Sequence, residues 1–243
     1  MAHLTIFLDD GGVMNDNRPR AAQWQRLVGA FFAPLLGGMP EAWAEANHVL
    51  TTGMFEPAAW QARMAAATDY DDLDRTYWRD WLLGMCAIVG VPAPAAEDAT
   101  ALGRRASAWI TPQVRTAYPG AVDAIRALHA AGYPLHTASG ESSADLAGYL
   151  EGMGVRACFG RLYGPDLINT LKAGPDYYVR LLADAGVDPA TALFVDDSPA
   201  VMGWAATAGA RAVLVSASPL ADSLATWHIS ALADLPGLLA RVE

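Results

Sequence analysis

The residues best placed for chemistry are two pairs of neighbouring aspartates, each directly after a short apolar run. Asp9-Asp10 follows residues 4–8, and Asp196-Asp197 follows residues 191–195. Runs of this length, rich in β-formers and bounded by turn residues, are typical of buried parallel strands. Because the carboxyl ends of parallel strands meet at one edge of a sheet, we expect the two pairs to converge there. Taken alone, either pair could instead be an acidic turn with no catalytic role.

A third predicted strand and a single lysine add groups that could hold a phosphate. Residues 133–138 run into Ser139 and carry Thr137 and Ala138 at the predicted strand end. Lys172 is the one lysine among sixteen basic residues, and it precedes a predicted helix. Clustered carboxylates suit Mg²⁺, a hard cation that prefers oxygen ligands. A hydroxyl and a lysine can bind phosphate oxygens. The set therefore suits attack on a phosphoryl group by an aspartate, with metal and lysine neutralising charge.

The segment after Asp16 has a different hydrophobic pattern from the residues before it. Up to about residue 115 it shows helical periods and no convincing strand. The predicted helices cover residues 24–36, 40–50, 57–67, 71–89 and 94–110. Six of the eight tryptophans fall here, most at core spacing. The aspartates at 69–74 lack the glycine and glutamate of a calcium loop, so we interpret them as a stabilised helix N-terminus. We expect a helical bundle inserted after the first strand.

From residue 118 strands and helices alternate, which predicts a parallel sheet with right-handed crossovers. The predicted helices cover residues 121–131, 142–153, 175–185, 199–208 and 232–241. Further short strands are expected within residues 156–163 and at residues 211–215. The fold class is thus α/β, with helices on both faces of the sheet.

Composition excludes several functions. The chain has 243 residues, 53% hydrophobic and 17% charged, as expected for a globular protein. Its net charge of -10 argues against nucleic acid or anionic lipid as partners. Two cysteines, Cys86 and Cys158, are too few for a disulfide scaffold. No signal peptide or membrane span is evident, so we expect a cytoplasmic protein, as a monomer or homodimer, with a small anionic substrate.

These segments together resemble the haloacid dehalogenase (HAD) superfamily, in its subclass with a helical cap after the first strand. The family's first motif, Asp-x-Asp-Gly-Thr/Val, is matched at Asp9, Gly12 and Val13. Residues 135–139 resemble the second motif, a strand ending in Thr or Ser. Lys172 matches the third, although the next residue is alanine where proline is common, and residues 194–198 match the fourth. Each motif is weak alone, but all four occur in the family's order.

The resemblance implies a three-layer Rossmann-like core of residues 1–16 and 116–243, with residues 17–115 as a mobile all-helical cap. It implies that Asp9 is a nucleophile forming an aspartyl intermediate. Mg²⁺ would be held by Asp9, the carbonyl of Gly11, Asp196 and Asp197. The substrate-binding set that we predict is Thr137, Ala138, Lys172 and the cap residue Arg18.

Gly11 departs from the family pattern. Phosphatases of the family carry an aspartate here as general acid and base, and glycine transfers no proton. Loss of such an acid costs about 10² to 10⁴ in rate for a poor leaving group. Asp10 is a poor replacement because neighbouring side chains leave a strand on opposite faces, so we interpret it as a spacer.

Three hypotheses follow from this departure. The first is a Mg²⁺-dependent phosphatase. In it, either the leaving group needs no general acid, or another residue (Asp16, Arg18 or His48) takes the place of the acid missing at Gly11. In a 2-haloacid dehalogenase, a halide leaves without a proton. Tyr178, six residues after Lys172, is compatible with that reaction, whereas the intact pair Asp196-Asp197 argues against it. The third is a non-catalytic ligand-binding protein. A phosphonatase-like Schiff base is disfavoured because the cap has no lysine.

Overall fold

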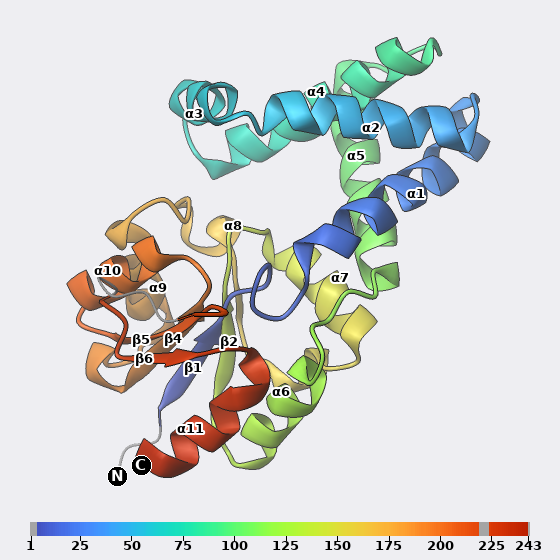
Figure 1. The fold of residues 1–243 in the computed structure, drawn as a ribbon. Helices are drawn as coiled ribbons and strands as arrows, with labels where there is room; N and C mark the ends of the chain where they lie inside the picture. Colours follow the sequence, from blue (N-terminus) through green and yellow to red (C-terminus); the bar gives the residue numbers. More distant parts are fainter. Residues whose placement is uncertain (1–3, 219–223, 243) are drawn as a thin grey trace. The chain divides into compact units, whose positions relative to one another are not determined.

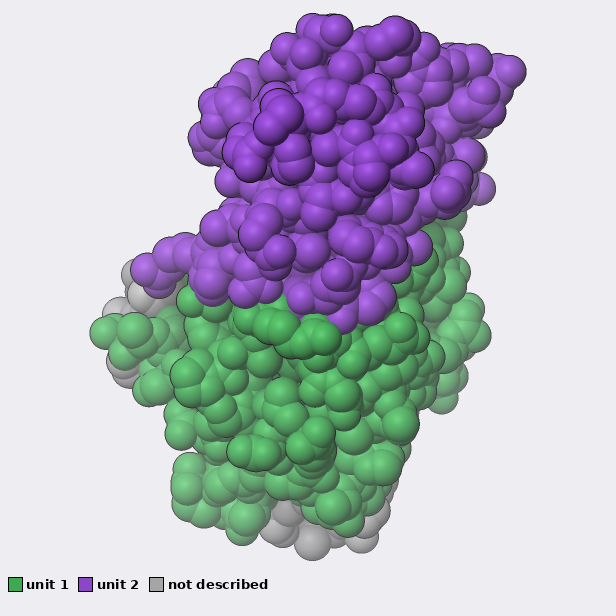
Figure 2. Space-filling view, turned by 90° about the vertical axis from the view of Figure 1, so that its right-hand side faces the viewer, with its two compact units in different colours: residues 1–17, 115–243 green, residues 18–114 purple. Residues whose placement is uncertain are grey.

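The computed structural model describes residues 4–218 and 224–242. The chain divides into two compact units, coloured separately in Figure 2. Unit 1 comprises Met1–Asn17 and Arg115–Glu243, and unit 2 comprises Arg18–Val114. Each of the two predicted boundaries lies one residue from these.

Unit 1 contains a six-stranded sheet in which every pair of neighbouring strands is parallel. The strands are β1 (Thr5–Leu8), β2 (Leu135–Ala138), β3 (Leu162–Tyr163), β4 (Ala192–Asp196), β5 (Arg211–Val215) and β6 (Trp227–Ile229). Their order is β3-β2-β1-β4-β5-β6, so β1 and β4 are central neighbours. The predicted α/β class with a parallel sheet is confirmed, and β6 was not predicted.

Helices cover both faces of this sheet (Figure 1). They are α6 (Ala121–Ala130), α7 (Ser143–Met153), α8 (Pro165–Ile168), α9 (Pro175–Ala185), α10 (Pro199–Thr207) and α11 (Leu235–Val242). Side chains of α6, α7 and α11 join Ile6 and Leu8 in one buried cluster. Side chains of α9 and α10 join Phe7 in the other. The alternation of β1 thus feeds two apolar layers, which gives the predicted three-layer core.

Short 3₁₀ helices complete the two units. They are η1 (Thr111–Gln113), η2 (Arg156–Cys158), η3 (Pro189–Thr191) and η4 (Leu232–Asp234).

Unit 2 is built from helices. They are α1 (Asn17–Leu36), which begins at the last residue of unit 1, α2 (Pro40–Met54), α3 (Pro57–Ala66), α4 (Tyr70–Val89) and α5 (Ala96–Ile110). Asp69 caps α4 by accepting a hydrogen bond from the Asp72 amide, and Gly90 ends the helix with φ of 78°. The acidic segment is therefore a helix start, as predicted.

Aromatic side chains form much of the core of unit 2. Phe32 stacks on Trp43 at 5.0 Å and meets Trp81 edge-on at 5.6 Å. The indole of Trp81 donates to the buried Asn47. Three of the six tryptophans in this unit are buried, while Trp109 is exposed. No helix in the described part of the chain is both long and apolar enough to cross a membrane.

Candidate active site

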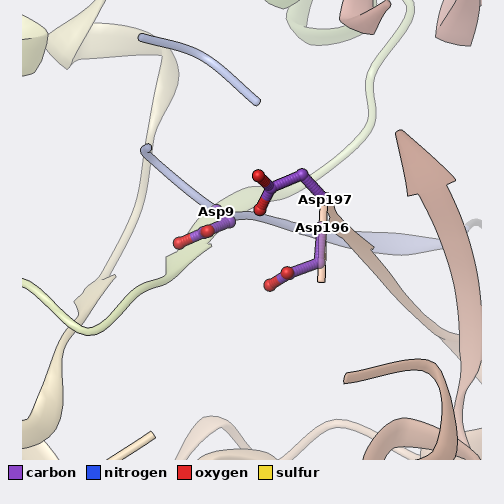
Figure 3. Close-up of side chains that lie close together, drawn as sticks. All are labelled: Asp9, Asp196 and Asp197. Carbon is purple, nitrogen blue, oxygen red and sulfur yellow. The ribbon is translucent and has the colours of Figure 1, made fainter. Parts of the chain in front are cut away.

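Three carboxylates meet at the carboxyl ends of β1 and β4. Asp9 directly follows β1, Asp196 is the last residue of β4, and Asp197 comes next. The register pairs Leu8 with Val195, and the Asp9 amide donates to the Val195 carbonyl at 3.0 Å. Each aspartate offers one carboxylate oxygen within 4.8 Å of the other two (Figure 3). Asp9 and Asp196 are buried, whereas Asp197 is exposed.

Lys172 bridges two of these carboxylates. Its Nζ lies 2.9 Å from Oδ1 of Asp9 and 2.6 Å from Oδ2 of Asp196. The loop between α8 and α9 carries this lysine to the strand ends. Burial works against its charge, but Asp9 and Asp196 outweigh burial and raise the pKa of Lys172. The lysine therefore stays protonated and fixes the orientation of Asp9.

The cluster remains short of positive charge. Burial raises the pKa of Asp196 to about 7, and repulsion from Asp9 contributes to this rise. Burial, and then Asp9, also raise the pKa of Asp197. One lysine thus faces three carboxylates that repel one another. Oxygen ligands with an unbalanced negative charge fit a hard divalent cation such as Mg²⁺. The predicted ligands Asp9, Asp196 and Asp197 are brought together, while ligation by the Gly11 carbonyl stays a prediction.

The glycine pair after Asp9 allows the turn to pass close to the cluster. Gly12 has φ of 85°, and a Cβ added there would lie 2.1 Å from Oδ2 of Asp197. A side chain at position 12 would therefore displace a carboxylate of the cluster. At Gly11, a Cβ would instead lie 2.7 Å from Oδ1 of Asn17. The Asn17 amide thus occupies the space next to the residue that replaces the family's general acid.

Asp10 is not part of the carboxylate cluster, and it has a structural role in addition to separating Asp9 from Gly11. It is completely buried, and its Oδ1 accepts a hydrogen bond from Nδ2 of Asn15 at 2.7 Å. Its carbonyl accepts from the amides of Met14 and Asn15. Thr116 donates to Oδ1 of Asn15 at 3.1 Å. Asp10 therefore holds the turn after β1 in shape.

The Thr137 hydroxyl is used within the sheet, and its predicted catalytic and substrate-binding role stays a prediction. The residue is completely buried within β2, and its Oγ1 donates to the Tyr163 carbonyl at 3.2 Å. Ser139, the first residue after β2, provides the hydroxyl at the strand end. Its Oγ accepts from the Glu141 amide at 3.3 Å. Ala138 pairs with Tyr163 in the last register position of β2.

Two further residues considered from the sequence belong to unit 2. Arg18 is the first residue of unit 2 and is exposed. Its substrate-binding role stays a prediction. His48 is exposed on α2 and forms a hydrogen bond with Gln25 at 3.2 Å. An acid role for His48 therefore has no support from its surroundings within that unit.

Tyr178 lies on α9 near the carboxylates. It is completely buried, and its hydroxyl has no hydrogen-bond partner among the described residues. Burial raises its pKa, with smaller contributions from Asp196 and Asp9. Its neighbour Tyr177 instead donates to the Ser139 carbonyl at 2.9 Å. The sequence indicated Tyr178 only through its spacing from Lys172.

Unit 2 contains a cavity of about 630 Å³ between α2, α3 and α4. Aliphatic side chains such as Leu50 and Met54 line it, together with Arg63 and Arg79. Both arginines form ion pairs with Asp80, at 3.0 Å and 2.8 Å. The cavity is therefore mainly apolar, and its two arginines are balanced by the lining carboxylates of Asp72 and Asp80.

The comparisons with known proteins agree with this geometry. The family model of haloacid dehalogenase-like hydrolases matches residues 5–209. A search of curated proteins found no significant match. Among solved structures, L-2-haloacid dehalogenase from Xanthobacter autotrophicus is 18% identical, with TM-score 0.62 and both chains fully covered. Magnesium-bound YfnB from Bacillus subtilis is 16% identical (TM-score 0.65), covering 98% of this chain and 99% of that one.

A third similar structure is a HAD phosphatase from Thermococcus onnurineus. It is 18% identical, with TM-score 0.60 and 97% of each chain covered. These likenesses support the fold, and they include a dehalogenase as well as a phosphatase. The match over residues 5–209, together with the carboxylate cluster and Lys172, shows that the chain belongs to the haloacid dehalogenase-like hydrolases.

Proposed function

We propose that this hydrolase cleaves small phosphate esters with Mg²⁺ and with Asp9 as nucleophile. The observation that carries the proposal is the third carboxylate, Asp197, within 4.8 Å of Asp9 and Asp196. A reaction without metal has no use for three mutually repelling carboxylates around one lysine. A divalent cation would neutralise them and polarise a phosphoryl group.

The residues of the chain have separate roles in this reaction. Lys172 holds Oδ1 of Asp9, so the carboxylate is oriented before the substrate arrives. Asp9 attacks phosphorus, the bond to the leaving oxygen breaks, and an aspartyl phosphate forms. Lys172 also places a positive charge where charge develops on the phosphoryl oxygens. Water then hydrolyses the aspartyl phosphate, which regenerates Asp9. Ser139, at the end of β2, replaces Thr137 as the proposed phosphate-binding hydroxyl.

Dehalogenation of a 2-haloacid is the second candidate. It is favoured by Gly11, which provides no proton donor, and by the buried hydroxyl of Tyr178 near Asp9 and Asp196. In that reaction Asp9 would displace halide from carbon without general acid catalysis. The non-catalytic hypothesis loses its basis because the chain belongs to a family of hydrolases.

Metal removal separates the two reactions. We expect p-nitrophenyl phosphate hydrolysis to require Mg²⁺ and to disappear with excess chelator. Asp9→Asn should lower kcat by roughly 10³-fold or more while leaving the circular dichroism spectrum unchanged. Asp197→Asn should raise the Mg²⁺ concentration needed for half-maximal activity. Chelator-resistant release of chloride from 2-chloropropionate, lost in Asp9→Asn, would instead establish the dehalogenase.

A further inference from the structure

The Asn17 side chain stands beside the turn that borders the carboxylate cluster. A Cβ added at Gly11 would lie 2.7 Å from Oδ1 and 2.9 Å from Nδ2 of Asn17. A Cβ added at the adjacent Gly12 would lie 2.1 Å from Oδ2 of Asp197. The Asn17 amide therefore borders one glycine of this turn, and a carboxylate of the cluster borders the next.

Asn17 is held at this position, yet its amide is available. The preceding residue, Asp16, donates its amide hydrogen to the Thr116 carbonyl at 2.8 Å, which fixes the start of α1. Asn17 itself is exposed, and within the described parts of the chain its side chain makes no hydrogen bond. A carboxamide can donate and accept hydrogen bonds, but it does not transfer a proton near neutral pH.

We propose that Asn17 hydrogen-bonds the leaving group, and that the substrates are phosphate esters whose leaving group departs as a stable anion. Aryl and acyl phosphates are of this class, whereas simple alkyl phosphates are not. The inference rests on the proposed phosphatase function. Asp9 forms the new bond to phosphorus, and the leaving oxygen takes the electron pair of the broken bond. Nδ2 of Asn17 donates a hydrogen bond to that oxygen and keeps its proton, so the leaving group is protonated later by water.

A series of aryl phosphates with graded phenol acidity, plus methyl phosphate, tests this assignment. With Mg²⁺ present, kcat/KM of the unmodified protein should fall steeply as the leaving group becomes less acidic, because nothing protonates it. Asn17→Ala should lower kcat/KM for the aryl esters by roughly 3- to 10-fold, the value of one neutral hydrogen bond. The matched control is Gln61→Ala, which removes an exposed amide from α3 and should leave the series unchanged.

A second variant tests the missing acid directly. Gly11 lies outside the left-handed region, so its backbone accepts a side chain once the Asn17 amide is removed. Gly11→Asp combined with Asn17→Ala should make the dependence on leaving-group acidity shallower than in Asn17→Ala alone. A shallow dependence in the unmodified protein, or Asn17→Ala behaving like Gln61→Ala, would overturn this inference while leaving the phosphatase proposal intact. Absence of Mg²⁺-dependent hydrolysis for every ester would overturn both.

Discussion

Gly12 is the residue at which one added carbon atom would most directly disturb the carboxylate cluster. We expect Gly12→Ala to displace Asp197, because the new Cβ would lie 2.1 Å from its Oδ2. The residue also holds φ of 85°, which costs an alanine roughly 1–2 kcal/mol. The Mg²⁺ concentration for half-maximal activity should rise about tenfold or more, measured by titration of the hydrolysis rate.

Gly140 offers a matched control for this substitution. It lies in the loop after β2, and a Cβ there would meet nothing within 4 Å. Gly140→Ala should therefore leave the Mg²⁺ titration unchanged. Equal titrations for Gly12→Ala and Gly140→Ala would contradict the placement of Asp197 against the turn.

Some residues of the candidate site could be predicted from the sequence alone, and others could not. The convergence of Asp9, Lys172 and the Asp196-Asp197 pair follows from strand ends that share one sheet edge. Thr137 lies inside β2, and the β2 bounds show that Ser139 is the first residue after the strand, which the sequence pattern alone did not separate. The Asn17 amide could not be assigned from sequence, because its contact with Gly11 depends on the path of the whole turn.

At the scale of elements, the turn between β1 and α1 is held by a buried network. Asn15 is 1% exposed, donating to Asp10 and accepting from Thr116. We expect Asn15→Ala to lower the free energy of unfolding by about 2–3 kcal/mol, because a buried carboxylate loses a hydrogen bond. Urea denaturation followed by tryptophan fluorescence would measure the loss.

Glu151→Ala, on the exposed surface of α7, serves as the comparison and should change stability by less than about 0.5 kcal/mol. Thr116→Val should lie between the two, since it removes the weaker bond to Asn15. A loss in Asn15→Ala no larger than that in Glu151→Ala would mean that the network adds no stability.

Elements with a clear hydrophobic period were predictable, and those formed by tertiary pairing were not. The helix predicted at residues 24–36 begins at Asn17, because a polar first turn with Pro19 hides the apolar period. β6 has only three residues, Trp227–Ile229, and no apolar run. It forms because β5 offers it a parallel edge, with Val213 paired to Trp227. Such a strand has no local sequence signal.

At the scale of the whole molecule, each buried cluster of the sheet consists entirely of residues from unit 1. The two connections that lead to unit 2 run side by side within unit 1. Asn15 forms an antiparallel bridge with Ala117, and the Tyr118 amide donates to the Met14 carbonyl at 3.0 Å. The ends of the inserted segment are thus already spaced like the two strands of a hairpin.

We therefore expect a chain in which an Asn-Gly turn replaces residues 18–114 to fold into the six-stranded sheet. It should keep the carboxylate cluster, since Asp9, Lys172, Asp196 and Asp197 all belong to unit 1. Mg²⁺ should raise its midpoint of thermal unfolding as it does for the full chain, because a ligand that binds only the folded state stabilises it. Hydrolysis of small esters should fall sharply, since the predicted cap no longer excludes water. The same truncation carrying Asp197→Asn should lose the Mg²⁺ effect, and a shortened chain without cooperative unfolding would show that unit 1 depends on unit 2 for its stability.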